Sequence, residues 1–335
     1  MKAVVKKEKG DGFVELLDVV EPEAQSGEYL VRVESAGICG SDLNILHDRF
    51  PGYNVPVIMG HEFAGTVEAG PDDGLPKGAR VACETHAYVC NQCGYCRSGL
   101  YNLCQKRRAF GYGVDGAFTK YVRVRKAIVH PLPDEISTEE GAVLEPLAGV
   151  VNALTKNSRI LPGESVVIFG PGPIGLLCLQ VAKLSGGNVT VVGTEHSAAR
   201  LRLAEKLGAE TMTDTDQSEE LENSEGSYDV SVIATGKAAA FETALRATKP
   251  NGRVVQIGES TERASFQFSL IEKKNLTVNG SFSHNWPIWE RSIALVKGGK
   301  VNLSSLITHR VSLENWKDGF DAAEGRQGVK ALIKP

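Results

Sequence analysis

Four cysteines gather in the stretch CNQCGYCRSGLYNLC, between residues 90 and 104. In a reducing compartment, thiols so closely spaced are more often metal ligands than disulfides. Four thiolates suit tetrahedral zinc and leave no position for a substrate, so we expect a structural zinc site. An iron–sulfur cluster and four unligated thiols are the alternatives. The expected ligands follow the spacing C-x2-C-x2-C-x7-C: Cys90, Cys93, Cys96 and Cys104.

Further candidate ligands lie outside this cluster. GICGSD contains Cys39, MGHE contains His61 and Glu62, and LEPLA contains Glu145. A thiolate, an imidazole and carboxylates form a mixed set, which is typical of a reactive zinc with a position left open. Each residue alone is ambiguous, because a lone Cys is usually core and a His–Glu pair is usually surface. Their joint presence beside a four-cysteine cluster favours a reactive zinc.

A glycine-rich loop predicts a nucleotide site. Gly170, Gly172 and Gly175 form G-x-G-x-x-G between the apolar run SVVIF and a helical pattern. In this setting the glycines permit a tight turn, close approach of a pyrophosphate and close packing of helix on strand. The helix N-terminus then faces the phosphates. A glycine-rich turn without a ligand is the alternative.

An acidic residue follows the second predicted strand, in VVGTEHSAAR. Glu195 could accept the ribose hydroxyls and repel a 2′-phosphate, which favours NAD over NADP. Thr194, His196 and Arg200 nearby could accommodate that phosphate, so NADP stays open. The expected cofactor-binding set is Gly170, Gly172, Pro173, Ile174, Gly175, Glu195, Arg200, Ala234 and Gly258.

The elements that position these residues fall into two patterns. Residues 1–145 contain short alternating or apolar runs separated by Gly, Pro and Asp, which predict a β-rich, barrel-like domain. From about residue 160, strands and helices alternate, which predicts a parallel sheet covered by helices and an α/β fold. After residue 285 we expect a helix at 289–300 and a strand at 329–334. The acidic stretch 213–226 is expected to be a surface loop.

Composition restricts the partners. The 335 residues carry 37 Lys and Arg against 41 Asp and Glu, a net charge of −4. This slightly acidic balance argues against a zinc ribbon that binds nucleic acid, and against an anionic membrane surface as a partner. The sequence has neither a signal-peptide pattern nor an apolar run long enough to span a bilayer, so we expect a cytoplasmic protein.

Together the motifs resemble the zinc-containing medium-chain dehydrogenase/reductase family over essentially the whole chain. GICGSD, GHEFAGTV, the cysteine cluster, LEPLA and GPGPIG occur in the family's order. The resemblance implies a GroES-like catalytic domain at 1–147 and 285–335, with a structural zinc lobe at 86–108. It also implies a Rossmann domain at 148–284, a substrate cleft between the domains, and a homodimer or homotetramer.

Glu62 and Glu145 resemble the polyol (sorbitol or L-iditol) and threonine dehydrogenase branch. The resemblance implies that Cys39 and His61 bind zinc directly and that Glu62 is the third ligand. Glu145 is then a fourth ligand or the partner of a bound water. Asp42 resembles the carboxylate that orients the histidine. Two zincs per chain are expected, one catalytic and one structural.

The implied reaction is the reversible oxidation of a secondary alcohol of a polyol, sugar or cyclitol to a ketone, with hydride transfer to NAD(P). Zinc would lower the proton affinity of the substrate oxygen, and Ser41 or a water held by Glu145 would take the proton. Family members often have a histidine where this chain has Asn44. His47 could substitute in the proton relay, although a surface position is the simpler interpretation.

Substrate contacts are expected from residues that resemble the family's cleft: Phe50, Phe118, His284 and Trp286. Trp286 could equally serve in interdomain packing. Ser283 and His284 stand where the polyol branch often has an arginine and an aromatic residue, so an amino alcohol or aminocyclitol is an alternative substrate. L-Threonine is another alternative. A zinc- and nucleotide-binding protein without turnover is the alternative of a different class.

Overall fold

The structure is a computed structural model that describes residues 1–213, 226–326 and 328–335. The chain forms two compact units, one of residues 1–145 with 284–335 and one of residues 146–283. These boundaries lie within two residues of those expected from the sequence. The acidic stretch expected as a surface loop falls almost entirely outside the described residues.

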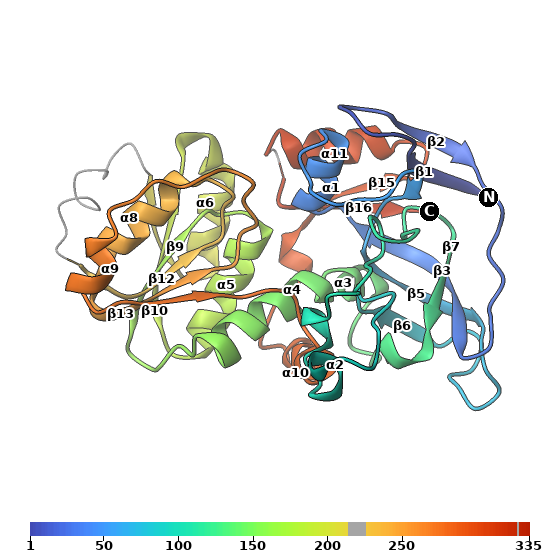
Figure 1. The fold of residues 1–335 in the computed structure, drawn as a ribbon, viewed down its shortest axis with the longest axis horizontal. Helices are drawn as coiled ribbons and strands as arrows, with labels where there is room; N and C mark the ends of the chain where they lie inside the picture. The colour runs from blue at the N-terminus through green and yellow to red at the C-terminus, as the bar shows by residue number, and fades with distance from the viewer. Residues whose placement is uncertain (214–225, 327) are drawn as a thin grey trace. The chain divides into compact units, whose positions relative to one another are not determined.

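The first unit is built on two β-sheets (Figure 1). The larger has the strand order β15-β16-β3-β5-β6-β8, with β7 also paired to β3, and the smaller has the order β2-β1-β4. The strands are β1 (Lys2–Lys6), β2 (Val14–Asp18), β3 (Glu28–Gly37), β4 (Val57–Ile58), β5 (Glu62–Ala69), β6 (Arg80–Cys83), β7 (Tyr121–Arg125), β8 (Val129–Pro131), β15 (Ile307–Ser312) and β16 (Lys330–Lys334). The predicted β-rich domain is therefore confirmed.

Short helices cover and connect these sheets. They are α1 (Gly40–Leu46), α2 (Gly94–Arg97), α3 (Thr138–Ala142), α10 (Trp286–Lys297) and α11 (Trp316–Glu324), while α4 (Leu144–Val151) spans the boundary of the two units. Helix α3 packs on β3 and β5, and α11 packs on β15 and β16. Helix α10 begins three residues earlier than the sequence pattern predicted, because Pro287 is compatible with the first turn of a helix.

The second unit is a parallel sheet with the strand order β11-β10-β9-β12-β13-β14. Its strands are β9 (Ser165–Phe169), β10 (Asn188–Gly193), β11 (Glu210–Thr213), β12 (Tyr228–Ile233), β13 (Thr248–Gln256) and β14 (Thr277–Gly280). Its helices are α5 (Pro173–Leu184), α6 (Ala198–Lys206), α8 (Ala239–Ala247) and α9 (Ser269–Lys273). Figure 1 shows α5 on one side of this sheet and α8 and α9 on the other.

Strand β9 shows why the apolar run SVVIF forms the centre of this sheet. It pairs in parallel with β10 on one side and β12 on the other. Val166, Val167 and Ile168 are completely buried, as expected for a strand that is covered on both faces. The expected α/β architecture is confirmed. No helix in the described part of the chain has the length and apolar character needed to cross a membrane.

Candidate active site

The register of β3 against β5 brings three of the predicted metal ligands together. Gly37, the last residue of β3, lies opposite Glu62, the first residue of β5. Cys39 follows β3 by two residues, and His61 immediately precedes β5. One ligand atom from each of Cys39, His61 and Glu62 lies within 4.8 Å of the others. Two motifs that are separate in the sequence therefore form one cluster of thiol, imidazole and carboxylate.

Glycine at position 37 makes room for this cluster. A Cβ atom placed on Gly37 would lie 2.2 Å from Oε2 of Glu62, well inside van der Waals contact. Any other residue would therefore displace the Glu62 carboxylate or separate the two strands.

Asp42 organises the other two ligands from the first turn of α1. The backbone N–H of Cys39, the N-cap residue, donates to Asp42 Oδ2 at 2.8 Å. Oδ1 of the same fully buried carboxylate lies 3.7 Å from His61 Nδ1. Burial alone would lower the pKa of His61, but the charge and hydrogen bond of Asp42, together with Cys39, outweigh burial and raise that pKa well above its usual value. With Nδ1 facing Asp42, Nε2 is the nitrogen available to a metal.

Lys330 neutralises Glu62 from the neighbouring strand β16. Its Nζ donates to Glu62 Oε2 at 2.6 Å and to the carbonyl of Ile38 at 3.1 Å. Burial raises the pKa of Glu62, and the charge of Lys330 opposes that rise. The other carboxylate oxygen, Oε1, is buried and has no hydrogen-bond partner among the described residues. A buried carboxylate oxygen without a hydrogen-bond partner fits the role of a metal ligand.

Sequence reasoning missed Lys330. It lies in the predicted strand at 329–334, and its side chain is almost completely buried. The available signal was a charged residue inside an otherwise apolar strand, because a buried lysine requires a partner.

Glu145 lies in the first turn of α4 and has a different partner. Its Oε1 accepts a hydrogen bond from Nε2 of the buried His284 at 3.1 Å. Burial raises the pKa of Glu145, but the hydrogen bond from His284, together with the electrostatic contributions of the neighbouring residues, outweighs burial and lowers it. Glu145 is thus electrostatically coupled to the cluster, although it is not one of the three residues whose ligand atoms converge.

The structure also places the two candidates for the proton relay. Ser41 Oγ lies 3.4 Å from His61 Nε2, so the serine hydroxyl reaches the cluster. His47 instead pairs with Asp11 through Nδ1 and with Glu324 through Nε2, both at 2.8 Å. These contacts favour the surface position for His47 over the role of the histidine that Asn44 replaces.

Aromatic side chains lie next to His61. Tyr112 meets its ring edge-on, with centroids 6.0 Å apart, and Phe50 lies 5.0 Å from Tyr112. Tyr112 was not predicted from the sequence, and Phe50 is part of the same aromatic group. Phe118 is fully buried in the core, where its ring would collide with any side chain at Gly60.

The four clustered cysteines converge as the spacing predicted. One Sγ from each lies within 4.8 Å of the others, and Cys90 Sγ is 3.5 Å from Cys104 Sγ and 3.9 Å from Cys96 Sγ. Tetrahedral zinc with Zn–S bonds of about 2.3 Å requires sulfurs about 3.8 Å apart. Hydrogen bonds from the backbone N–H groups of Gln92 and Cys93 lower the pKa of Cys90 to about 6, whereas burial and the neighbouring thiols raise that of Cys96 to about 12. The geometry therefore fits zinc.

The glycine loop of the second unit has the features of a nucleotide cradle. Gly170 has φ of 104°, a conformation that favours glycine. A Cβ on Gly175 would lie 1.8 Å from the carbonyl oxygen of Gly170, so only glycine lets α5 pack this closely. A Cβ on Gly172, the N-cap of α5, would meet nothing within 4 Å. The helix N-terminus is thus open where the phosphates are expected.

The other predicted cofactor residues follow the ends of parallel strands. Glu195 lies two residues after β10, Ala234 directly after β12, and Gly258 two residues after β13. Ligands of open α/β sheets bind at this carboxyl edge. Pro173 and Ile174 form the first turn of α5, and Arg200 lies in α6.

Comparison with known proteins agrees with this architecture. The family model described as "Alcohol dehydrogenase GroES-like domain" matches residues 25–134, and "Zinc-binding dehydrogenase" matches residues 173–298. Sorbitol dehydrogenase of Halalkalibacterium halodurans is 35% identical, with 100% of this chain and 99% of that protein covered. D-arabitol-phosphate dehydrogenase of Enterococcus avium is 34% identical, with 100% and 97% covered. L-threonine 3-dehydrogenase of Pyrococcus horikoshii is 36% identical, with 99% and 98% covered.

Solved structures show the same fold. A zinc-binding dehydrogenase of Sinorhizobium meliloti bound to NADP has a TM-score of 0.88 and 31% identity, with 100% of this chain and 99% of that chain covered. An alcohol dehydrogenase of Escherichia coli complexed with NADH has a TM-score of 0.89 and 25% identity, with the same shares covered.

The chain therefore belongs to the zinc-containing medium-chain dehydrogenase/reductase family. It is a zinc-dependent oxidoreductase that uses a nicotinamide cofactor. Within the family it falls in the branch that contains polyol and threonine dehydrogenases, as the pattern of Glu62 and Glu145 predicted.

Proposed function

We propose that the protein reversibly oxidises a secondary alcohol of a polyol, sugar or cyclitol to a ketone, with NAD as the preferred hydride acceptor. The observation that carries the proposal is the convergence of Cys39, His61 and Glu62, in which a buried carboxylate oxygen has no hydrogen-bond partner in the described part of the chain. Three protein ligands leave a tetrahedral metal with one position for the substrate. Zinc held there would supply the Lewis acidity that makes an alcohol oxygen easier to deprotonate.

The chain's own residues do the remaining work. Asp42 fixes the Cys39 backbone and faces His61, so the two ligands keep one orientation. Ser41, whose Oγ lies 3.4 Å from His61 Nε2, or a water held by Glu145 would accept the hydroxyl proton. Lys330 offsets the buried negative charge of Glu62, whereas the nearby carboxylate of Glu145 raises the pKa of Glu62 by like-charge repulsion. The glycine loop holds the pyrophosphate of the cofactor, which carries the hydride chemistry.

Preference for NAD rests on Glu195. It is exposed just beyond β10, where a carboxylate can accept the ribose hydroxyls and would repel a 2′-phosphate. Arg200 is the residue that would favour NADP instead. Relatives in the solved structures carry either NADP or NADH, so cofactor preference varies within the family.

Two zincs per chain are proposed, because the first unit contains two clusters with different chemistry. The four-thiol cluster has a complete tetrahedral set and suits a structural ion. The Cys39 cluster has an incomplete set and suits a reactive ion. All seven cysteines are free of disulfides, which supports a reducing compartment such as the cytoplasm.

We also propose that the protein assembles into a homo-oligomer through β14. This strand pairs with β13 on one side only among the described residues, and Val278 within it is exposed. An exposed strand edge readily pairs with a second copy. Size-exclusion chromatography with light scattering would distinguish a dimer, a tetramer and a monomer.

The function is tested with zinc analysis and a substrate panel. Protein purified without chelator should contain two zincs and oxidise polyols, sugar alcohols or cyclitols with NAD. Cys39→Ala and His61→Ala should each lose the second zinc and all turnover while retaining the fold by circular dichroism. Activity confined to 2-amino-3-hydroxy acids would favour the threonine alternative, which the Pyrococcus horikoshii relative supports. Turnover that survives both substitutions would overturn the proposal.

A further inference from the structure

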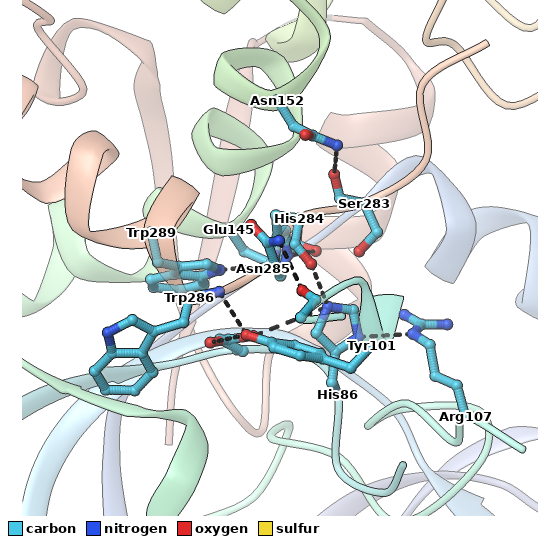
Figure 2. A network of polar contacts seen from close by, with 12 residues as sticks. His86, Tyr101, Arg107, Glu145, Asn152, Ser283, His284, Asn285, Trp286 and Trp289 are labelled. Atoms are coloured by element: carbon cyan, nitrogen blue, oxygen red, sulfur yellow. Dashed lines mark hydrogen bonds and ion pairs between the residues drawn. The ribbon is translucent and has the colours of Figure 1, made fainter. Parts of the chain in front are cut away.

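A second group of buried polar residues lies beside the four-cysteine lobe, which we define as residues 86–108. Glu84, His86 and His284 are completely or almost completely buried, and one ligand atom from each lies within 4.8 Å of the others. Such a group could be taken for a third metal site. The hydrogen bonds around it, drawn in Figure 2, point to a different role.

The partners of His284 fix its tautomer. The indole N–H of Trp289 donates to His284 Nδ1 at 2.8 Å, and an indole nitrogen can only donate. Nδ1 of the neutral ring is therefore the acceptor, and the ring proton is on Nε2. That proton points at Glu145 Oε1, 3.1 Å away. Both ring nitrogens are occupied, so His284 is available neither to a metal nor to the substrate contact expected from the sequence.

His86 is fixed in the same way and holds the backbone of His284. The Arg107 guanidinium donates from Nε to His86 Nδ1 at 2.7 Å, and a guanidinium nitrogen also can only donate. His86 must then donate from Nε2 to the carbonyl oxygen of His284, at 2.8 Å. A cation next to one ring nitrogen and a carbonyl next to the other exclude metal binding by His86.

The lobe forms hydrogen bonds with the two residues that follow His284. The Asn285 side chain donates to the carbonyl oxygen of Gly99 at 2.9 Å, and the Trp286 backbone N–H donates to the Tyr101 hydroxyl at 2.5 Å. The Tyr101 hydroxyl in turn donates to both oxygens of Glu84, at 2.8 and 2.9 Å. Gly99 and Tyr101 lie between the third and fourth cysteines, so the metal-binding fold of the lobe determines where they are.

We propose that His284 is a positioning residue for Glu145, held in one tautomer by Trp289 and anchored by the four-cysteine lobe. The polar network places the N–H of His284 on Oε1 of the Glu145 carboxylate, which is electrostatically coupled to Glu62, His61 and Lys330. This inference rests on the proposed function, in which Glu145 serves the reactive metal. According to this inference, the structural zinc lobe has a second role besides stabilising the fold. It positions the segment 284–286, whose His284 orients Glu145.

The test uses one conservative change at each step. Trp289→Phe keeps a buried ring but removes the donor to His284, so the imidazole can carry its proton on Nδ1 and present a lone pair to Glu145. His284→Leu removes the donor, and His284→Gln restores an N–H at nearly the same reach. Trp316→Phe is the matched control, because Trp316 is a buried tryptophan of α11 in the hydrophobic core of the same unit.

The readouts are kcat, KM for NAD, and the rate at which EDTA removes the more labile zinc. We expect Trp289→Phe and His284→Leu to lower kcat at least tenfold and to release that zinc at least tenfold faster. KM for NAD should stay within twofold. His284→Gln should recover most of both losses, and Trp316→Phe should match the unmodified protein. Tyr101→Phe, which removes the hydroxyl that Trp286 reaches, should change both readouts in the same direction by a smaller factor.

Different outcomes would overturn the positioning role of His284 and the proposed function. If the labile zinc depends on Cys39 but Trp289→Phe and His284→Leu behave like the control, the positioning role is wrong and the proposed function stands. If His284→Gln is no better than His284→Leu, the hydrogen bond is not what matters, which also overturns the inference. If Trp289→Phe fails to fold, the His284 pair and Tyr101→Phe decide. A second zinc that persists in Cys39→Ala instead overturns the proposed function.

Discussion

Lys330 and Glu62 form a buried ion pair, in which Nζ lies 2.6 Å from Oε2 and both side chains are at most 2% exposed. Removing one member of such a pair leaves an uncompensated charge, which typically costs several kcal/mol. The pair engages Oε2 of Glu62, whereas Oε1 is buried and has no hydrogen-bond partner among the described residues. The contact between Lys330 and Glu62 therefore affects both the stability of the fold and the candidate metal ligand Glu62.

The ion pair predicts strong energetic coupling. We expect Lys330→Met to lower the free energy of unfolding by about 3 kcal/mol. Adding Glu62→Gln should restore part of that loss, because the remaining buried group is then neutral. A double-mutant cycle by denaturant unfolding should give a coupling energy of about 1–3 kcal/mol. Additive effects within about 0.5 kcal/mol would show that the pair contributes nothing specific.

The contact between Gly37 and Glu62 predicts a steric effect. A Cβ at position 37 would lie 2.2 Å from Glu62 Oε2, so Gly37→Ala must displace the carboxylate. We expect the second zinc to be lost and kcat to fall at least tenfold. Gly40→Ala is the control, because a Cβ there meets nothing within 4 Å. Equal zinc content in the two variants, measured by mass spectrometry, would contradict the prediction.

The four-cysteine lobe predicts a loss of stability that precedes the loss of turnover. Cys93→Ser removes one of four thiolates from a closed zinc site, and such ions contribute directly to folding. We expect a fall in melting temperature of several degrees and one zinc fewer per chain. Activity measured well below the melting temperature, where the variant is still folded, should fall much less than stability does. Cys178→Ser, at a buried position in α5, separates loss of a ligand from loss of a core thiol.

Cofactor preference predicts an asymmetric effect at Glu195. Glu195→Ala should raise KM for NAD by about tenfold, a loss of about 1.4 kcal/mol of binding, and should change KM for NADP much less. The reason is that a carboxylate accepts hydrogen bonds from the ribose of NAD but repels the 2′-phosphate of NADP. Lys206→Ala, at the exposed last residue of α6, is the control. Equal effects on both cofactors would remove Glu195 from the ribose site.

An acid-sensitive contact lies in the second unit. Asp229 accepts hydrogen bonds from the Ser165 side chain and backbone and pairs with Lys249 at 3.0 Å. Burial alone would raise the pKa of Asp229, but these partners outweigh it and lower the pKa from 3.8 to about 2. Because the folded-state pKa is depressed, the stabilisation is present above pH 3.8 and is lost as the pH falls toward 2.

Asp229→Asn should therefore destabilise the protein at pH 6 by about 1 kcal/mol, a figure reduced for solvent screening of a partly exposed pair. The difference from the unmodified protein should shrink as the pH approaches 2. Urea unfolding of both proteins between pH 6 and pH 3 measures this difference. A difference that is constant across that range would show that Asp229 titrates normally.

Local patterns predicted much of this protein. The apolar run SVVIF coincides with strand β9, residues 165–169, to the residue, because Gly170 directly after it ends the strand. Cys39, His61 and Glu62 were found because each lies in a short motif. Lys330, Tyr112 and the roles of Trp289 and Tyr101 were not found. They act through contacts between residues far apart in the sequence, and neither periodicity nor spacing records such contacts.

The position of strand β16 near the end of the chain determines the order in which the two units can be completed during synthesis. This strand pairs with the end of β3 that precedes Cys39, and it carries the lysine that neutralises Glu62, 268 residues later in the chain. A ribosome therefore completes the whole second unit before the first can balance its buried charge. Domains tend to fold as they emerge, so the inserted unit should be able to fold while the reactive site is still unfinished. Metal loading at that site would then be one of the last events in the maturation of the protein.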